Sequence, residues 1–318
     1  MSPEIAALFA TIFSTTFFVT VLRTTTPLLL ATLGGLVADL SGALNVALEG
    51  QMLVGCLTAV IVSVYAPWYV GVLSGLLAGA LLGAIMAFFA LRMKADIILV
   101  GFAINILAAS GTVFALTIAT GGDKGTSINL PSKAIPPVDL GFLGGIPGIG
   151  DFLVRVLSGH SVLTWVAAFL VFAIWYFLYR TPWGLWLRGV GEYPAAPEAA
   201  GIPVGKVRAW SLVVSGALAG LGGAQLAMFN YVGFTRDMTA GRGFIALGAV
   251  LLGARHPVGA LAAALLFGVF EGLSIVMPGL FNWIPTEWIH MIPFAVTILA
   301  LLLFSMRAQR ALALRGGR

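Results

Sequence analysis

The sequence predicts an all-α integral membrane protein with about ten transmembrane elements. Of the 318 residues, 60% are hydrophobic and only 9% are charged, whereas soluble domains carry roughly 25% charged residues. The hydrophobic residues form long continuous runs, and a membrane β-barrel would instead alternate apolar and polar residues. A surface this apolar needs lipid as its solvent, so membrane lipid is the first expected partner.

The uncharged runs locate the elements in chain order, because a helix crosses the bilayer with about 20 apolar residues. The expected crossings are residues 5–22, 24–40, two within 50–91 that divide at Ala66-Pro67-Trp68, 97–122, 161–179, 209–235, 257–277 and 288–306. A shorter apolar segment, 244–253, is bounded by glycine and charge, and we expect it to be short or re-entrant. The first run lacks a basic leader and an A-x-A cleavage site, which favours a retained helix over a signal peptide.

The positions of Lys and Arg predict the orientation. With ten crossings both termini share one side, and that side holds Arg92, Lys94, Arg180, Arg188, Lys206, Arg208, Arg255, Arg307, Arg310, Arg315 and Arg318. The other side holds Arg23, Lys124, Lys133, Arg155, Arg236 and Arg242. Both termini are therefore expected in the cytoplasm, although nine crossings would place the N-terminus outside. Residues 1–318 then form one membrane domain, with an outside loop at about 120–160 and an inside loop at about 180–208.

The motifs of common enzymes are missing from the sequence. The string 201–207 has the wrong spacing for a phosphate-binding loop and lacks its Ser or Thr. His160, His256 and His290 are scattered, and the lone Cys56 lies in an apolar run, where we expect a core residue. We therefore expect no enzyme, no cofactor and no metal site. Uphill transport would need energy from another subunit or from an ion gradient.

A few polar residues lie where a membrane makes them costly. Asn45 and Glu49 belong to the string Ser41-Gly-Ala-Leu-Asn45-Val-Ala-Leu-Glu49-Gly50. Its glycines indicate a broken helix that frees backbone groups for a ligand, or a helix start whose i, i+4 side chains bind a neighbour. Asn105 and Glu271 lie inside predicted crossings. Each is expected to line a pathway or to join helices.

The inside loop predicts two short helices. Its first part, from Trp183 to Arg188, has the aromatic and basic residues of an interfacial helix. An Ala-rich stretch follows, which prolines begin and Gly201 ends. A helix this short is marginal alone, so it docks either in a groove of another protein or on its own bundle. Gly216 and Gly220, in the later stretch 215–224, have the small-xxx-small spacing of close helix packing.

Four strings, in this order along the chain, resemble the permeases of ABC importers. They are Pro27-Leu-Leu-Leu-Ala-Thr-Leu-Gly-Gly35 with the string 41–50; Gly184-Leu-Trp-Leu-Arg188-Gly-Val-Gly191-Glu192-Tyr-Pro194-Ala195-Ala196 with Ala200-Gly201-Ile202; Ser215-Gly-Ala-Leu-Ala-Gly-Leu-Gly-Gly-Ala224; and Met238-Thr-Ala-Gly241-Arg242-Gly243-Phe244. The most similar group is that of the nucleoside and simple-sugar permeases, relatives of the branched-chain amino acid and ribose permeases. Tyr193, Gly189 and Trp186 depart from the usual second string, which affects the details of an ATPase contact.

The resemblance implies a permease of the cobalamin-importer (type II) architecture in a bacterial plasma membrane. Its partners would be two ABC ATPase subunits, a second and usually different permease chain, and an extracytoplasmic substrate-binding lipoprotein, with no nucleic acid. The ATPase-coupling residues would be Gly191, Glu192, Pro194, Ala195, Ala196, Ala200, Gly201 and Ile202.

The function expected from this resemblance is alternating-access transport of a small polar solute, with a nucleoside favoured over a monosaccharide or a branched-chain amino acid. The translocation pathway would be lined by Asn45, Glu49, Asn105, Gln225 and Glu271. The alternative from another class is a secondary transporter that an ion gradient drives.

Overall fold

A computed structural model describes residues 11–12, 14–123, 125–127, 130–141, 145, 150–280, 285–299 and 302. These residues are helical apart from connections and one short antiparallel pair, β1 (Pro137–Val138) with β2 (His160–Ser161). The helices are α2 (Thr15–Leu40), α3 (Leu48–Tyr65), α4 (Trp68–Ala87), η1 (Phe88–Arg92), α5 (Ile97–Thr120), α6 (Gly150–Leu157), α7 (Val162–Arg180), α8 (Pro182–Glu192), α9 (Ala195–Ala199), α10 (Val204–Gln225), η3 (Leu226–Asn230), α11 (Arg242–Leu252), α12 (Pro257–Val276), η4 (Met277–Gly279) and α13 (Thr286–His290).

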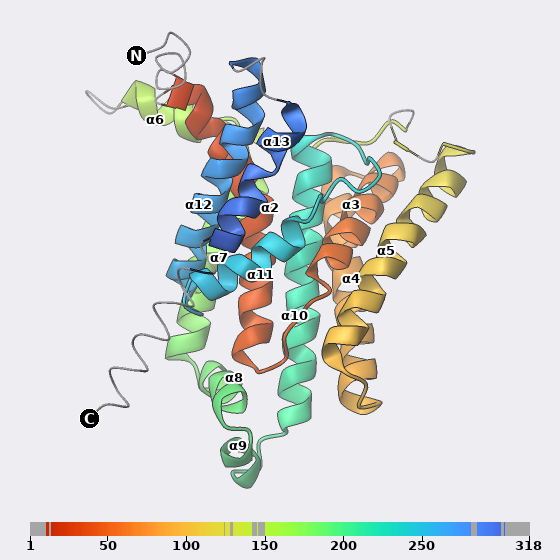
Figure 1. Cartoon of the computed structure of the whole chain (residues 1–318), viewed down its shortest axis with the longest axis vertical. Coiled ribbons are helices and arrows are strands. Elements are labelled where there is room, and N and C mark those ends of the chain that lie inside the picture. The colour runs from red at the N-terminus through yellow and green to blue at the C-terminus, as the bar shows by residue number, and fades with distance from the viewer. Residues whose placement is uncertain are drawn as a thin grey trace.

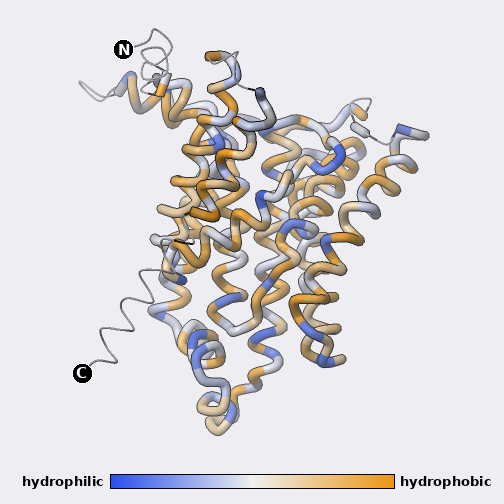
Figure 2. Tube along the Cα trace, viewed as in Figure 1, coloured by the Kyte–Doolittle hydropathy of each residue, from blue (hydrophilic) through white to orange (hydrophobic). Residues whose placement is uncertain are grey.

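Within the described residues, seven helices are long and apolar enough to cross a membrane. They comprise α2, α3, α4 with η1, α5, α7, α10 with η3, and α12 with η4. The predicted all-α membrane class is therefore confirmed, and α11 is a short apolar helix, as the sequence predicts. Figure 2 shows hydrophobic residues along the long helices and hydrophilic ones near their ends. The predicted crossing 288–306 and the four C-terminal arginines lie partly or wholly outside the described residues.

The predicted break near Arg23 is wrong, because α2 continues through it as one helix of 26 residues. Arg23 reaches the Gly159 carbonyl at 3.4 Å and lies over the Phe229 ring, so its charge finds partners without a break. The hydroxyls of Thr20 and Thr26 bond to carbonyls one turn earlier, at 2.9 and 2.8 Å, which satisfies them inside the helix. The described part of the two expected crossings, from Thr15 to Leu40, is therefore one helix, and residues 1–10 lie outside the described part.

Helix α10 is central, with α2, α3 and α4 packed around it (Figure 1). Gly216 and Gly220 face Gly75 and Gly79 of α4 so closely that an added Cβ would strike the opposite backbone. Small residues allow this approach in lipid, where helix association depends on van der Waals packing. The predicted packing role of these glycines is confirmed. Cys56 of α3 is buried and donates to the Gly223 carbonyl of α10 at 3.1 Å, consistent with a core position.

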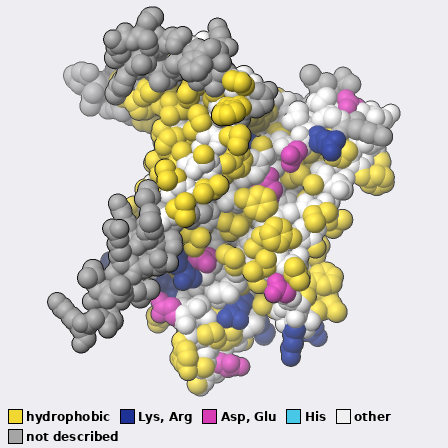
Figure 3. All heavy atoms as spheres, viewed as in Figure 1, with side chains coloured by type: hydrophobic (Ala, Val, Ile, Leu, Met, Phe, Trp, Pro, Cys, Tyr) yellow, Lys and Arg dark blue, Asp and Glu magenta, His cyan; other side chains and the backbone are white. Residues whose placement is uncertain are grey.

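The described basic residues separate toward two ends of the molecule. Arg92 and Lys94 lie at the α4–α5 turn, and Lys206 lies near the start of α10. The turn and the helix start are both at the lower end in Figure 1. Arg255 joins them there, since its Nε binds the Asp39 carboxylate at the end of α2 at 2.6 Å. Lys133, by contrast, donates to the Ala66 carbonyl at the opposite end. Figure 3 shows the visible Lys and Arg mainly toward the lower end of a largely hydrophobic face.

Candidate functional site

Helix α2 ends at Leu40, and the chain then rises without helical structure to α3 (Figure 1). We call residues 41–47 the junction. Asn45, at its centre, is fully buried. Its Nδ2 donates to Gln51 Oε1 and to Ser215 Oγ, each at 2.8 Å, and its Oδ1 accepts from the Ala47 amide at 3.0 Å. Asn45 thus fastens the junction to both α3 and α10.

The side chain of Asn105, on α5, bonds to two backbone groups that have no helical partner at the break between α2 and α3. Its Nδ2 donates to the Val46 carbonyl at 2.9 Å, and its Oδ1 accepts from the Gly50 amide at 2.8 Å. Backbone groups without partners are costly in a membrane, so one amide side chain stabilises two of them at once. Gly50 is required here, because an added Cβ would lie 2.9 Å from Asn105 Oδ1.

Glu49, at the start of α3, binds the first turn of α11. Its Oε1 accepts from the Gly241 amide at 2.8 Å, and its Oε2 accepts from the Gly243 amide at 2.7 Å. Gly241 caps α11 with a φ of +80°, a conformation that suits glycine. A carboxylate at a helix N-terminus satisfies free amides and complements the helix dipole. The first and the last strings of the resemblance therefore meet at this contact.

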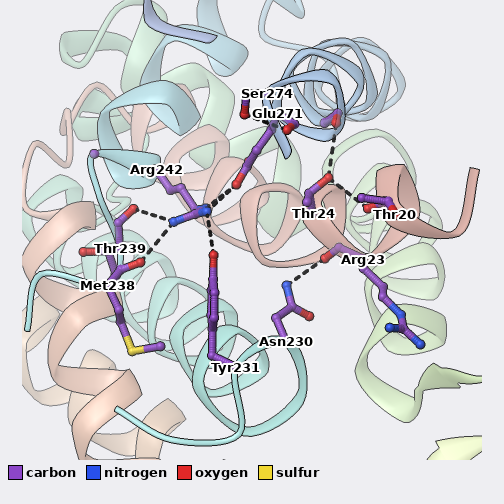
Figure 4. Close-up of polar contacts among 12 residues, drawn as sticks. Thr20, Arg23, Thr24, Asn230, Tyr231, Met238, Thr239, Arg242, Glu271 and Ser274 are labelled. Atoms are coloured by element: carbon purple, nitrogen blue, oxygen red, sulfur yellow. Dashed lines mark hydrogen bonds and ion pairs between the residues drawn. The ribbon is translucent and has the colours of Figure 1, made fainter. Parts of the chain in front are cut away.

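Arg242, the first residue of α11, pairs with Glu271 of α12 (Figure 4). Its Nε donates to Glu271 Oε1 at 2.8 Å, and its Nη1 donates to the carbonyls of Met238 and Thr239 at 3.0 and 3.2 Å. The Tyr231 hydroxyl lies 3.5 Å from Nη2. Only 12% of the Arg242 side chain and 11% of the Glu271 side chain are exposed, so each charge depends on the other.

Sequence reasoning missed this role and placed Arg242 in an outside loop. The available signal was Glu271 itself, because a carboxylate inside an apolar helix needs a cation from elsewhere in the bundle. Arg242 lies between two glycines, directly before the short apolar segment.

Gln225 has different neighbours. It is fully buried near the end of α10, where its Oε1 accepts from Ser161 Oγ at 2.7 Å. Ser161 in turn caps α7. Ten residues separate Gln225 from Ser215, the partner of Asn45, which corresponds to about 15 Å along a helix. The Nε2 of Gln225 has no partner within the described residues, and a π-helical turn, η3, follows it directly.

The five predicted pathway residues therefore divide into two groups. Asn45, Glu49 and Asn105 surround the junction, and Glu271 is linked to them through Arg242 and the first turn of α11. Gln225 lies farther along α10. In this conformation the polar atoms of the first group bond within the chain. The arrangement holds a broken helix, a short helix and α12 in one hydrogen-bonded set.

The loop after α7 forms the two short helices that the sequence predicts. Helix α9 lies at the lowest point in Figure 1, and Pro197 is its only buried residue. Gly201 follows it with a φ of +80°. The Gly201 amide bonds to the Glu198 carbonyl and the Ile202 amide to the Pro197 carbonyl, each at 2.9 Å, which is a Schellman cap. Glu192, Ala195, Ala196, Ala200 and Gly201 are exposed, while Gly191, Pro194 and Ile202 are partly buried.

The end of α8 packs directly on the junction. A Cβ on Gly191 would lie 2.9 Å from the Leu40 carbonyl carbon and 3.1 Å from the Gly42 amide nitrogen, so only glycine fits without a shift. Arg208, at the start of α10, donates from Nε to the Ser41 carbonyl at 3.2 Å. The exposed helix α9 is therefore one short helix away from the junction that holds Asn45.

Comparison with known proteins identifies the family. Residues 17–301 match the family described as branched-chain amino acid transport system / permease component. The chain belongs to this permease family. It is 38% identical over 293 residues to the guanosine ABC transporter permease protein NupQ of Bacillus subtilis, covering 89% of each chain. It is 34% identical to the nucleoside ABC transporter permease protein NupC of Lactococcus lactis, covering 89% of this chain and 90% of that one.

Another relative is named for a different substrate. The chain is 30% identical over 251 residues to a putative glucose ABC transporter permease protein, TsgC13, of Haloferax volcanii, covering 79% of this chain and 74% of that one. Family membership makes this chain the membrane-spanning permease subunit of an ABC importer. It is not an enzyme, and it works with separate ATPase subunits and a substrate-binding component.

Proposed function

We propose that this permease carries nucleosides across a bacterial plasma membrane. The proposal depends on one observation: over 89% of its length the chain is 34–38% identical to two permeases, one named for guanosine and one for nucleosides. A monosaccharide is the second candidate, because the relative named for glucose is also similar over most of the chain. A nucleoside is neutral and rich in hydrogen-bonding groups, which suits amide and hydroxyl side chains such as those of Asn45, Gln225 and Ser215.

A second, related permease chain completes the proposed translocation unit. In Lactococcus lactis the chain resembles NupC over 89% of its length and NupB over only 37%. In Bacillus subtilis it resembles NupQ over 89% and NupP over 42%. Each organism thus has a relative similar over most of the chain and another similar over part of it, which supports a heterodimer. Helix α5 offers a surface for the second chain, since only 22% of its most apolar stretch is buried, the smallest share among the seven described spans.

The lower end of the molecule in Figure 1 is the proposed cytoplasmic end. Arg92, Lys94, Lys206 and Arg208 lie there, which accords with the excess of basic residues in cytoplasmic loops. The exposed α9 would then seat in a groove of an ABC ATPase, with the coupling residues from Gly191 to Ile202 at the contact. The lipoprotein would dock at the opposite end, and the full assembly would have about ten elements per chain in a type II arrangement.

The proposed mechanism is alternating access that begins at α9. Closure of the ATPase pair would move α8, whose Gly191 lies against Leu40 and Gly42. The junction would pass this motion to Glu49, which holds the first turn of α11, and then through Arg242 to Glu271 on α12. ATP shifts the population toward one state only by binding the two states unequally. The groups that bond within the chain in one state would exchange those bonds for the solute in another.

Uptake measurements test the substrate directly. A strain that lacks this permease would be supplied with labelled guanosine, glucose and leucine, with and without the gene restored. The binding lipoprotein would be titrated with the same compounds. We expect restored uptake and tight binding of the nucleoside alone. Restored uptake of glucose or leucine alone would overturn the nucleoside proposal, and uptake that does not require ATP would overturn the coupling scheme.

A further inference from the structure

Two apolar grooves flank the lower end of α10. The first has a volume of about 790 Å³ and lies between α7, α8 and α10, with Phe177, Trp183, Trp186 and Trp210 in its lining. The second has a volume of about 550 Å³ and lies between α4, η1 and α10. Lys206, in the first turn of α10, lines both grooves. Lys206 therefore places a positive charge between two apolar grooves at the end of a membrane helix.

Two cations line these grooves. Arg92 also lines the second groove. Within the described residues, neither Lys206 nor Arg92 has an ion pair, and none of their side-chain atoms makes a hydrogen bond. The carboxylates at this end lie outside the grooves: Asp39 binds Arg255, Asp96 caps α5, and the exposed Glu192 and Glu198 line neither groove.

Indole rings lie at the mouth of the first groove. Trp183 and Trp210 are 62% and 68% exposed, so the groove opens outward from the bundle. Trp183 and Trp186 also contact each other, with ring centroids 4.8 Å apart. Tryptophan concentrates at the level of lipid headgroups, where its ring spans apolar and polar surroundings. Lysine there extends its charge toward the headgroups while its stem lies on apolar surface.

We propose that an anionic phospholipid binds at the lower end of α10, with its phosphate on Lys206 and its acyl chains in the two grooves. Basic pockets between membrane helices on the cytoplasmic side suit such headgroups. The apolar linings exclude a polar solute, and the unpaired charge excludes a purely apolar occupant. Because α8 and α10 both line the first groove, the lipid would tie the base of the coupling segment to the central helix.

Lipid retention by the assembled transporter tests this proposal. The complex would be purified in mild detergent, incubated with equal amounts of phosphatidylglycerol, cardiolipin and phosphatidylethanolamine, and analysed by native mass spectrometry. We expect the anionic lipids to be retained over the zwitterionic one. Lys206→Gln should lower the affinity for them by about fivefold, the size expected for one juxtamembrane cation.

Three variants keep the result interpretable. Lys206→Arg should retain the lipid, because it preserves the charge. Lys133→Gln, at the opposite end, should bind as the parent does. Trp210→Ala should weaken retention of every acyl lipid through loss of the groove wall. Equal retention of anionic and zwitterionic lipids, or anionic retention in Lys206→Gln equal to that of the parent, would overturn the proposal and leave the grooves to a protein neighbour. Neither result would bear on which solute is transported.

Discussion

Glu49 accepts a hydrogen bond from the Gly243 amide at 2.7 Å, although 194 residues separate them. This bond and its counterpart at Gly241 fix the start of α11 to the start of α3. A short helix in a membrane protein has few other constraints on its first turn. The contact therefore decides where Arg242 points, and with it the partner of Glu271.

Replacing Glu49 should loosen α11. In Glu49→Gln one oxygen still accepts, but the charge is lost and an amide NH₂ faces the Gly241 or Gly243 amide. We expect a loss of about 1 kcal/mol of stability from the helix-terminus interaction and reduced nucleoside uptake, measured by thermal unfolding of the purified complex and by uptake in cells. Asp237→Asn is the control, since Asp237 is an exposed carboxylate in the loop before α11. Equal effects of the two variants would contradict the assignment.

Breaking the Arg242–Glu271 pair should cost more. Removal of one partner of a buried pair leaves an uncompensated charge, with a typical cost of about 3 kcal/mol or more. Arg242→Gln and Glu271→Gln should each lower the unfolding temperature strongly, while the double variant should be less damaging than the sum of the two. A double-mutant cycle on thermal stability measures this coupling. Additive effects would show that the pair does not act as a unit.

Gly191→Ala tests the contact between α8 and the junction. The new methyl group would meet the Leu40 carbonyl and force the two segments apart. We expect ATP hydrolysis that no longer drives uptake, measured as the ratio of nucleoside transported to phosphate released in proteoliposomes. Gly205→Ala, in the first turn of α10, is the control, because a Cβ there meets nothing within 4 Å. An unchanged ratio in Gly191→Ala would remove the junction from the coupling route.

Bulky residues on α9 should block assembly with the ATPase. Ala195 and Ala196 are exposed on a helix that buries only Pro197. Ala195→Trp with Ala196→Trp should therefore leave the unfolding temperature of the permease unchanged while reducing co-purification of the ATPase subunits. Full co-purification would show that the ATPase binds elsewhere.

His160 should make stability depend on pH. It is fully buried, and burial lowers the pKa of its imidazole. The bond of His160 to the Val156 carbonyl at 2.8 Å raises the pKa by less, and the charge of Arg23 lowers it further. The folded state thus binds a proton less readily than the unfolded state, so stability falls as the pH drops below the unfolded value of about 6.5. Unfolding temperatures at pH 7.5 and 5.5 should differ more for the parent than for His160→Gln. An equal difference would contradict this.

The local features could be predicted from the sequence because they depend on nearby residues. Gly201 ends α9 because a left-handed residue closes the cap, and Gly216 and Gly220 pack closely because they lack side chains. The continuity of α2 could not be predicted, since it depends on Gly159 and Phe229 receiving Arg23 from across the bundle. The same holds for Arg242: Glu271 indicates that a cation is needed, but the loop-like setting of Arg242 does not identify it as that cation. Contacts between distant segments decided these cases, and residue type alone did not.

The glycine contact between α4 and α10 limits how the bundle can move. Where two helices touch through backbone atoms, no change of side-chain rotamer can let one slide past the other. The two helices thus move as one rigid body, held together at Gly75, Gly79, Gly216 and Gly220. The same backbone approach joins α10 to α2 at Gly34 and Gly222, and to α3 at Gly55 and Gly223. Any rearrangement during a transport cycle must therefore carry these contacts as one body, and its hinges must lie outside them, for example in the junction.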